Sequence, residues 1–374
     1  MRSRPRPHPD RRPAAGDGAT GAGVLGVDSG GSGLRVRLAV PKGGPAGDPA
    51  SSRSPVRTGP DGIDPGHLME QLVPMARGLM ARAGVCELRA VAVGAAGMAT
   101  LGDALRAELP EALAKEFGVT RLALAADAVT AYAGALGRRP GAVVAAGTGL
   151  IALGTDLRTW RRADGWGHLL GDCGSGAWIG RAGLEAALRA HDGRAGGSAA
   201  LLARAEARFG PAPGLPGQLY PRTDRPAVLA SFAPEVAAAA AGEPSVTAGH
   251  APAATDDTVH SDTGDPVAAG ILCDAARHIA ESAAAVCPSG PPCDVALTGG
   301  LLGLGAPLLG PLGRELDQRL PHARQVTAAG DPLDGAVAIA LDLADGRTDL
   351  PVDGHLLYVW PEPNDREPAP AQHG

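Results

Sequence analysis

Residues 24–40 read VLGVDSGGSGLRVRLAV, two apolar runs joined by a turn that contains three glycines. Val24 to Val27 has the composition of a buried strand, whereas Leu34 to Val40 alternates large apolar residues with arginine or alanine. Both patterns are typical of β-strands. The segment therefore predicts a β-hairpin with a glycine-rich turn at residues 28–33.

The turn of this hairpin has the composition of a phosphate-binding loop. Glycine lets backbone N–H groups converge on an anion, and the candidate donors are Gly30, Gly31 and Ser32. Asp28, at the end of the first strand, is a candidate ligand for Mg²⁺ through water, because this hard cation prefers oxygen ligands and retains several waters. An ordinary glycine hairpin is the alternative interpretation, and the turn lacks the Gly-Lys-Ser/Thr ending of a P-loop.

The same strand–turn–strand pattern returns further along the chain. Ala142–Ala146 and Leu150–Gly154 have strand patterns, and Gly147, Thr148 and Gly149 lie between them. The repetition indicates an internally duplicated architecture with one glycine turn in each half. Two such turns that face each other could hold the β- and γ-phosphates of ATP from both sides, as phosphoryl transfer requires.

A glycine pair and an aspartate complete the candidate nucleotide site. Gly299 and Gly300 follow a predicted strand at 294–297, where adenine could lie against bare backbone; a plain strand-to-helix turn is the alternative. Asp127 follows a buried strand and begins a helix, at the kind of sheet edge where α/β proteins bind ligands. It is the candidate base that accepts the hydroxyl proton, although a helix N-cap would also account for it.

Residues 165–176 read GWGHLLGDCGSG and precede a predicted helix. A loop this dense in glycine brings backbone close to a ligand. Asp172, the one carboxylate in the segment, is suited to bind a hydroxyl-rich substrate. Together with the two glycine turns, the segment indicates a kinase that phosphorylates a sugar.

The composition limits the classes of protein to which the chain can belong. It has 374 residues, 44% of them hydrophobic, which suffices for two domains with buried cores. The net charge is -6, and no basic patch is dense enough to indicate nucleic-acid binding. No apolar run reaches the roughly 18 residues of a membrane span, and the N-terminus lacks the apolar core of a signal peptide, which favours a cytoplasmic protein. The five cysteines have scattered spacing and are expected to be free thiols. The sequence does not decide whether the protein forms a homodimer.

Composition also divides the chain into two expected domains with flanking tails. The first domain is expected at residues 23–138 and the second at 139–346, within which 243–264 has the composition of a surface insertion. Residues 1–22 are expected to be a disordered tail, and 347–374 a C-terminal tail.

Periodicity predicts most of the remaining elements. Helices are expected at 64–83, 103–117, 128–136, 177–190, 198–209, 225–241, 267–286, 307–320 and 333–344. Further strands are expected at 88–93 and 121–125, and the apolar residues 358–360 are candidates to dock on the folded part.

Taken together, the motifs at Asp28, Asp127, Gly147 and 165–175 resemble those of the N-acetylglucosamine kinase branch of the BadF/BadG/BcrA/BcrD ATPase family. The resemblance covers residues 24–345, and Gly-Trp-Gly…Gly-Asp-x-Gly-Ser is its most specific part. It implies the actin-like ATPase (ribonuclease H-like) fold, an α/β architecture of two lobes with a duplicated mixed-sheet domain and a central cleft. It also implies an ATP- and Mg²⁺-dependent kinase that acts on the 6-hydroxyl of an amino sugar, N-acetylglucosamine or glucosamine.

The resemblance implies roles for individual residues. Asp127 would be the catalytic base at the sugar 6-hydroxyl. The implied nucleotide-binding residues are Gly30, Gly31 and Ser32 in a first phosphate loop, Gly147, Thr148 and Gly149 in a second, and Gly299 and Gly300 beside the adenosine. The implied sugar-binding residues are Gly165, Trp166, Asp172 and Ser175, with Asp61 as a further candidate.

Three positions depart from the family pattern. Cys173 stands where the family usually has Glu, and Ser32 stands where it has Thr. Asp61 lies in a loop where the family commonly carries a sugar-binding Asn. A carboxylate at that place would favour an unacetylated amino sugar, whose ammonium group is positive. Kinetics on glucosamine and N-acetylglucosamine test this hypothesis.

Two other functions are weighed against the kinase. A family ATPase that activates a dehydratase would hold an iron–sulfur cluster between subunits, but the cysteines do not follow that cluster-binding pattern. A non-catalytic sugar sensor would retain the fold and lose the reaction, and the presence of Asp28, Asp127 and Asp172 argues against it.

Overall fold

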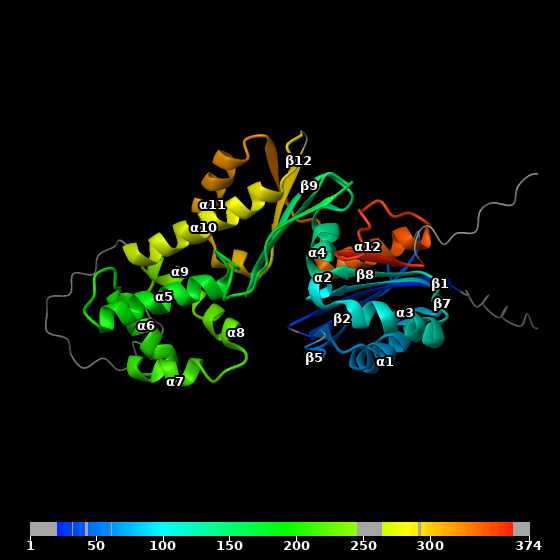
Figure 1. The fold of residues 1–374 in the computed structure, drawn as a ribbon, viewed down its shortest axis with the longest axis horizontal. Coiled ribbons are helices and arrows are strands. Elements are labelled where there is room, and N and C mark those ends of the chain that lie inside the picture. Colours follow the sequence, from blue (N-terminus) through cyan, green and yellow to red (C-terminus); the bar gives the residue numbers. More distant parts are fainter. Residues whose placement is uncertain are drawn as a thin grey trace, which may run out of the picture.

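The computed structural model describes residues 21–31, 33–41, 44–60, 62–244, 264–290 and 293–361. Ser32, Asp61, and most of the expected N-terminal tail and surface insertion therefore lie outside the described residues. Two lobes, each built around its own β-sheet, lie side by side (Figure 1). The predicted two-lobed α/β architecture is confirmed, because the two strand–turn–strand units belong to separate sheets.

The first sheet brings the carboxyl ends of its central strands to one edge. Its order is β14-β8-β7-β1-β2-β3, with β4 paired to β2. The strands are β1 (Gly21–Gly30), β2 (Gly33–Val40), β3 (Gly44–Pro45), β4 (Ala50–Ser52), β7 (Val85–Ala95), β8 (Leu122–Ala126) and β14 (Leu357–Trp360). β1 and β2 form the predicted antiparallel hairpin, whereas β1, β7 and β8 are parallel. Their register places Asp28 beside Gly94, and Ala95 beside Ala126.

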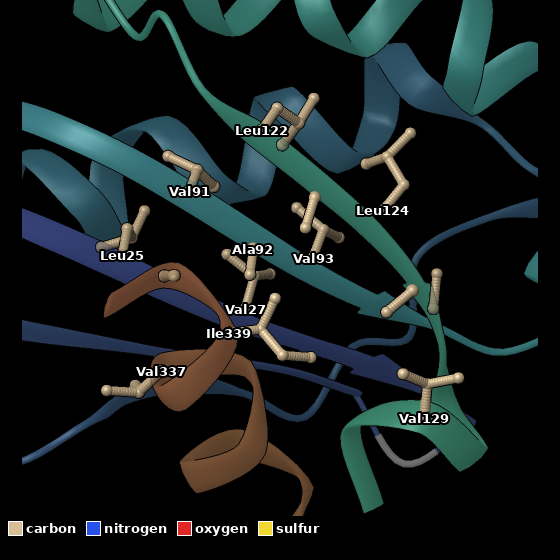
Figure 2. Close-up of a cluster of buried hydrophobic side chains, with 14 of the residues drawn as sticks. Leu25, Val27, Val91, Ala92, Val93, Leu122, Leu124, Val129, Val337 and Ile339 are labelled. Carbon is tan, nitrogen blue, oxygen red and sulfur yellow. The ribbon is translucent and has the colours of Figure 1, made fainter. Parts of the chain in front are cut away.

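Helices cover both faces of this sheet. They are α1 (Pro65–Ala83), α2 (Met98–Leu101), α3 (Asp103–Phe117), α4 (Asp127–Leu136) and α12 (Pro332–Ala344), with a small ribbon of β5 (Thr58–Gly59) and β6 (Gly62–Ile63). Figure 2 shows Ile339 of α12 beside Val27 of β1, and Val337 of the same helix also belongs to this buried core. Gly335 lets α12 approach α4 closely, since a Cβ there would come within 1.9 Å of the Thr130 carbonyl oxygen.

The second sheet has the order β11-β10-β9-β12-β13. Its strands are β9 (Gly141–Ala146), β10 (Leu150–Thr155), β11 (Trp160–Asp164), β12 (Cys293–Thr298) and β13 (Ala323–Thr327). β9 and β10 form the second antiparallel hairpin, and β12 runs parallel to β9 with Thr298 opposite Ala145. The carboxyl ends of β9 and β12 therefore also lie together.

A helical layer completes the second lobe around a separate core that includes Phe232, Leu272 and Ile279. The helices are α5 (Gly176–His191), α6 (Ala199–Phe209), α7 (Leu215–Leu219), α8 (Arg225–Ala230), α9 (Ala233–Ala240), α10 (Pro266–Val286) and α11 (Ala306–Arg319), with 3-10 turns at Ala212–Gly214 and Gly300–Leu304.

The C-terminal part of the chain lies on the first lobe, contrary to the expected domain boundaries. Those boundaries place α12 in the second domain and residues 347–374 in a tail. In the structure α12 packs against β1, β7 and α4, and β14 extends the first sheet with Leu357 opposite Ala125. The apolar face of α12 fills the first core, so the chain returns to the first lobe after completing the second.

Smaller expectations also need correction. Gly21 and Ala22 extend β1 instead of belonging to the tail. The predicted helix at 225–241 is two helices, α8 and α9, separated at Ser231 and Phe232. β11 and β13 were not predicted, because both are largely polar and incompletely buried.

Cys287 and Cys293 form a disulfide that joins the end of α10 to the start of β12, so the expectation of five free thiols is wrong. Cys86, Cys173 and Cys273 are free. In the part of the chain that the structure describes, no helix combines the length and the apolar character needed to cross a membrane.

Candidate active site

A cavity of 740 Å³ opens between the two lobes, at the edge where the parallel strands end. Both sheets contribute to its wall: Ala126 and Asp127 follow β8, while Ala146 and Gly147 follow β9. The predicted site residues on the wall are Asp127, Gly147, Gly149, Gly165, Trp166, Asp172 and Gly299. Segments distant in sequence thus meet because the carboxyl ends of strands from both sheets border this cavity.

Asp127 lies at the start of α4 and is accessible from the cavity. Its Oδ1 accepts a hydrogen bond from the Ala128 N–H at 2.8 Å. The surrounding protein removes bulk water from the carboxyl group, and this desolvation, together with the charge of Asp28, raises its pKa. The N–H bond and the positive charge of Arg162 act in the opposite direction. A carboxylate with a raised pKa is a stronger general base than an ordinary aspartate.

The second glycine turn is anchored to the N-terminus of α5. Gly147 N–H donates to the Gly149 carbonyl at 2.9 Å, and the turn accepts hydrogen bonds from the N–H groups of Gly176 and Ala177. The carbonyl of Thr148 takes the second of these bonds, and Thr148 itself is exposed. Helix N-termini carry partial positive charge, which favours a phosphate nearby.

Of the two glycines that follow β12, Gly299 lies on the cavity wall and Gly300 does not. Gly299 lines the cavity with φ of 104°, and a Cβ there would meet the Ala146 carbonyl oxygen at 2.1 Å. Only glycine fits this combination of conformation and close approach. Gly300 is exposed and begins the 3-10 turn that precedes α11.

The segment at 165–176 folds around two carboxylates. Asp164 accepts hydrogen bonds from the N–H groups of Asp172 at 2.6 Å and Cys173 at 2.8 Å. Asp172 Oδ1 in turn accepts one from Gly167 N–H at 3.1 Å. Burial raises the pKa of Asp172, and the charge of Asp164 adds to this effect. Trp166, 64% exposed, presents its ring at the cavity wall.

The first hairpin turn lies beside the cavity and not on its wall. Asp28, at the end of β1, accepts hydrogen bonds at Oδ2 from Arg35 Nε at 3.0 Å and Nη2 at 2.6 Å. Arg35 Nη1 also donates to Asp331 at 2.6 Å. A Cβ added to Gly30 or Gly31 would meet no atom within 4 Å, so the backbone of the turn is open to a ligand.

The donor set at this edge fits magnesium bound together with a nucleotide. Mg²⁺ in such sites keeps several waters and takes one or two protein carboxylates, the rest of its ligands coming from phosphate. Asp28 is the carboxylate in question, and its charge acts on the neighbouring Asp127. Among the described residues there is no cluster of three or more metal-binding side chains, so the protein alone does not form a metal cage there.

Ser175 has a structural role that conflicts with its assignment to the sugar. It is fully buried, and its Oγ accepts a hydrogen bond from Trp178 N–H at 3.2 Å as the N-cap of α5. It does not line the cavity. Its place in the motif is explained by helix capping.

Sequence reasoning missed several residues of the cavity wall. Gly97, with φ of 76°, and Thr100 follow β7, and Arg162 lies on β11. The glycines that end β7 were the available signal for the first two. Arg162 had none, because the strand that carries it was not predicted.

Comparisons with known proteins relate the chain to one family and one fold. The model of the BadF/BadG/BcrA/BcrD ATPase family matches residues 25–340. A curated relative, the N-acetylmuramic acid/N-acetylglucosamine kinase of Clostridium acetobutylicum, is 30% identical over 182 residues, which make up 46% of this chain and 55% of the relative. The chain thus matches little more than half the length of that relative.

Two solved structures share the fold. A candidate N-acetylglucosamine kinase from Chromobacterium violaceum is 27% identical with a TM-score of 0.63, covering 85% of this chain and 98% of the other. A candidate N-acetylglucosamine kinase from Porphyromonas gingivalis is 17% identical with a TM-score of 0.60, covering 85% and 99%. The second likeness concerns the fold alone.

Proposed function

The chain belongs to the BadF/BadG/BcrA/BcrD ATPase family, and we propose that it is an ATP-dependent kinase that phosphorylates an amino sugar. One observation carries the proposal: Asp127, the glycine turn at 147–149 and Asp172 line a single cavity between the lobes. A base, a phosphate-binding turn and a hydroxyl-binding carboxylate are the parts that transfer to a sugar requires. The names of the Clostridium and Chromobacterium relatives support a sugar as the acceptor.

In this proposal each lobe supplies part of the nucleotide site. The turns at 30–31 and 147–149 hold the phosphates of ATP through backbone N–H groups, and Gly299 and Gly300 border the adenosine. Asp28 holds Mg²⁺ through water, and the metal neutralises phosphate charge when it is bound. Closure of the lobes around the substrates excludes water and limits hydrolysis of ATP.

The sugar lies between Trp166 and Asp172, whose carboxylate binds its hydroxyl groups. Asp127 accepts the proton of the 6-hydroxyl as the oxygen attacks the γ-phosphorus and the bond to ADP breaks. The raised pKa of Asp127 suits this role, since the group must gain a proton during the reaction. N-acetylglucosamine and glucosamine both carry this hydroxyl and are the proposed substrates.

Release of ADP measured across a panel of sugars tests the proposal. N-acetylglucosamine or glucosamine is expected to stimulate release, and their comparison also tests the hypothesis about Asp61. Asp127→Ala is expected to lower kcat by about 10²- to 10⁴-fold. Asp192→Asn is the matched control, because this exposed aspartate pairs with Arg194 and neither residue lines the cavity. Failure of every hexose and hexosamine to stimulate ADP release would refute the kinase, and near-full activity of Asp127→Ala would refute the base.

A further inference from the structure

Arg162 is a cavity-lining cation whose contacts are all with neutral groups. From β11 its Nε donates to the Asp164 carbonyl at 3.1 Å and its Nη2 to the Gly165 carbonyl at 2.7 Å. The guanidinium carbon lies 4.6 Å from the centre of the Trp166 ring. Within the described ranges no carboxylate forms an ion pair with it. The half-buried charge is therefore held in place without being neutralised.

Arg35, beside the cavity, differs in this respect, because it pairs with Asp28 and Asp331. A partly desolvated charge is costly unless an opposite charge compensates it. For Arg162 the described chain supplies only the charge of Asp127, which acts on it without forming an ion pair, and an anion that enters the cavity would complete the compensation.

The contacts of Arg162 also orient it in advance. Two backbone carbonyls and an aromatic face hold the planar guanidinium, so little side-chain freedom remains to be lost when a ligand binds. The bonds use Nε and Nη2 and do not involve Nη1. Guanidinium groups held in this way bind planar or branched oxyanions through paired N–H donors.

The position of Arg162 places this charge opposite the candidate base. Arg162 and Asp127 line the same cavity from different lobes. They are near enough for the positive charge of Arg162 to act on the Asp127 carboxyl group. An anion bound by Arg162 would therefore lie close to the hydroxyl that Asp127 activates.

We propose that Arg162 binds an oxyanion of the reactants, an inference that rests on the proposed kinase function. Two groups supply this chemistry. One is the phosphoryl group during its transfer, whose equatorial oxygens carry the developing charge. The other is a carboxylate substituent on an acidic amino sugar. The first source makes Arg162 a part of the reaction with every sugar, and the second makes it a determinant of specificity.

The test compares Arg162→Gln and Arg162→Lys with Arg161→Gln. Arg161 is the neighbouring residue on β11, is exposed, and lines a different cavity beside Asp156 and Pro140. Successive residues on a strand face opposite sides, so Arg161→Gln removes the same charge from the other face. Melting temperatures of all variants establish that each is folded, and Arg162→Lys keeps the charge should Arg162→Gln fail to fold.

Steady-state kinetics with N-acetylglucosamine, which has no carboxylate, and N-acetylmuramic acid, which has one, separate the two sources. A fall in kcat of about 10²- to 10³-fold with both sugars identifies the phosphoryl group, the range found for other donors to transition-state charge. A rise in KM confined to N-acetylmuramic acid identifies the carboxylate. Unchanged kinetics with both sugars would overturn the proposal.

A binding measurement tests the oxyanion site without requiring catalytic turnover. Inorganic phosphate, titrated against the full chain and followed by the melting temperature, is expected to bind Arg162→Gln at least about fivefold more weakly than wild type or Arg161→Gln, the size of an effect near 1 kcal/mol. Equal phosphate binding by all three proteins would contradict an oxyanion site at Arg162. If wild type phosphorylates no sugar yet this difference is present, the kinase proposal fails and the oxyanion site remains.

Discussion

The Asp172 carboxylate lies directly against Gly149: a Cβ at Gly149 would come within 2.6 Å of Asp172 Oδ2. The second glycine turn and the segment at 165–176 are therefore packed into one unit. Gly149 is required here for close approach and not for an unusual backbone angle, because its φ is outside the left-handed region. The carboxylate it contacts is also bonded to Gly167 N–H, which limits how far it can move.

Gly149→Ala is expected to displace the Asp172 carboxylate from its hydrogen bond with Gly167. Since small misplacements of a substrate-binding group are costly, kcat/KM for the sugar should fall by up to about 10²-fold. The matched variant is Gly147→Ala, where a Cβ meets no atom within 4 Å. It should keep the wild-type KM for the sugar and weaken ATP binding alone. Equal sugar kinetics for Gly149→Ala and wild type would contradict the packing argument.

Asp127→Asn is expected to stabilise the protein while it removes activity. The asparagine Oδ1 can keep the bond from Ala128 N–H, and the desolvated charge next to Asp28 is lost. Because Asp127 is exposed toward the cavity, solvent reduces this gain, and only its direction is expected. Urea titration measures the change. Asp127→Ala lacks the acceptor for Ala128 and should gain less.

The difference in the free energy of unfolding between Asp127→Asn and wild type should depend on pH. The folded-state pKa of Asp127 is raised, so the folded protein holds this proton more tightly than the unfolded chain. The contribution of Asp127 to stability is thus most favourable below its unfolded pKa and is lost as the pH rises through the folded pKa. The advantage of Asp127→Asn over wild type should grow from acid toward neutral pH and then level off. An advantage that is constant across this range would mean that the carboxyl group is not perturbed.

Asp331→Ala is expected to loosen α12 from the first lobe. Asp331 caps this helix by accepting Asp334 N–H at 3.0 Å and pairs with Arg35 at 2.6 Å. Loss of such a cap costs about 0.5–2 kcal/mol of stability. Asp345→Ala, at the other end of α12, is the control and should change stability little, because a negative charge near a helix C-terminus is not favourable.

The loss of stability caused by Asp331→Ala should disappear at low pH. Partial burial acts to raise the pKa of Asp331, but the Asp334 N–H and Arg35 together hold it below the ordinary value. The ionised group therefore stabilises the fold above its unfolded pKa, and this contribution is lost as the pH falls through the lowered value. Differences in melting temperature measured down an acid series check the sign.

Gly299→Ala and Gly300→Ala should separate structural from ligand-binding roles in adjacent residues. A side chain at Gly299 would collide with the Ala146 carbonyl, and the positive φ of this residue is strained for any residue other than glycine. The free energy of unfolding of Gly299→Ala should therefore fall by about 1–3 kcal/mol. Gly300 has open space around its Cβ position, and its substitution should leave stability unchanged. A rise in KM for ATP in Gly300→Ala would support the proposed adenosine contact, and an unchanged KM would remove Gly300 from the site.

Local sequence patterns were sufficient for most elements and for one half of the site. The apolar runs that end before Asp127 and Gly147 predicted where β8 and β9 stop, whereas β1 continues past Asp28 to Gly30. The residues that follow β8 and β9 lie on the wall of one cavity. Glycine at 147–149 signalled close approach of backbone, because only a missing side chain permits it. These are properties of short segments, so they can be read without knowledge of the rest of the chain.

Only the tertiary structure decided what lies opposite those strand ends. Arg162 reaches the cavity because an edge strand with a polar sequence pairs with β10, and Ser175 turned out to cap a helix. The return of α12 and β14 to the first lobe depends on apolar surfaces that are complementary across hundreds of residues of chain. Such contacts are selected by the free energy of burying one surface against another, and periodicity within a single segment carries no information about its partner.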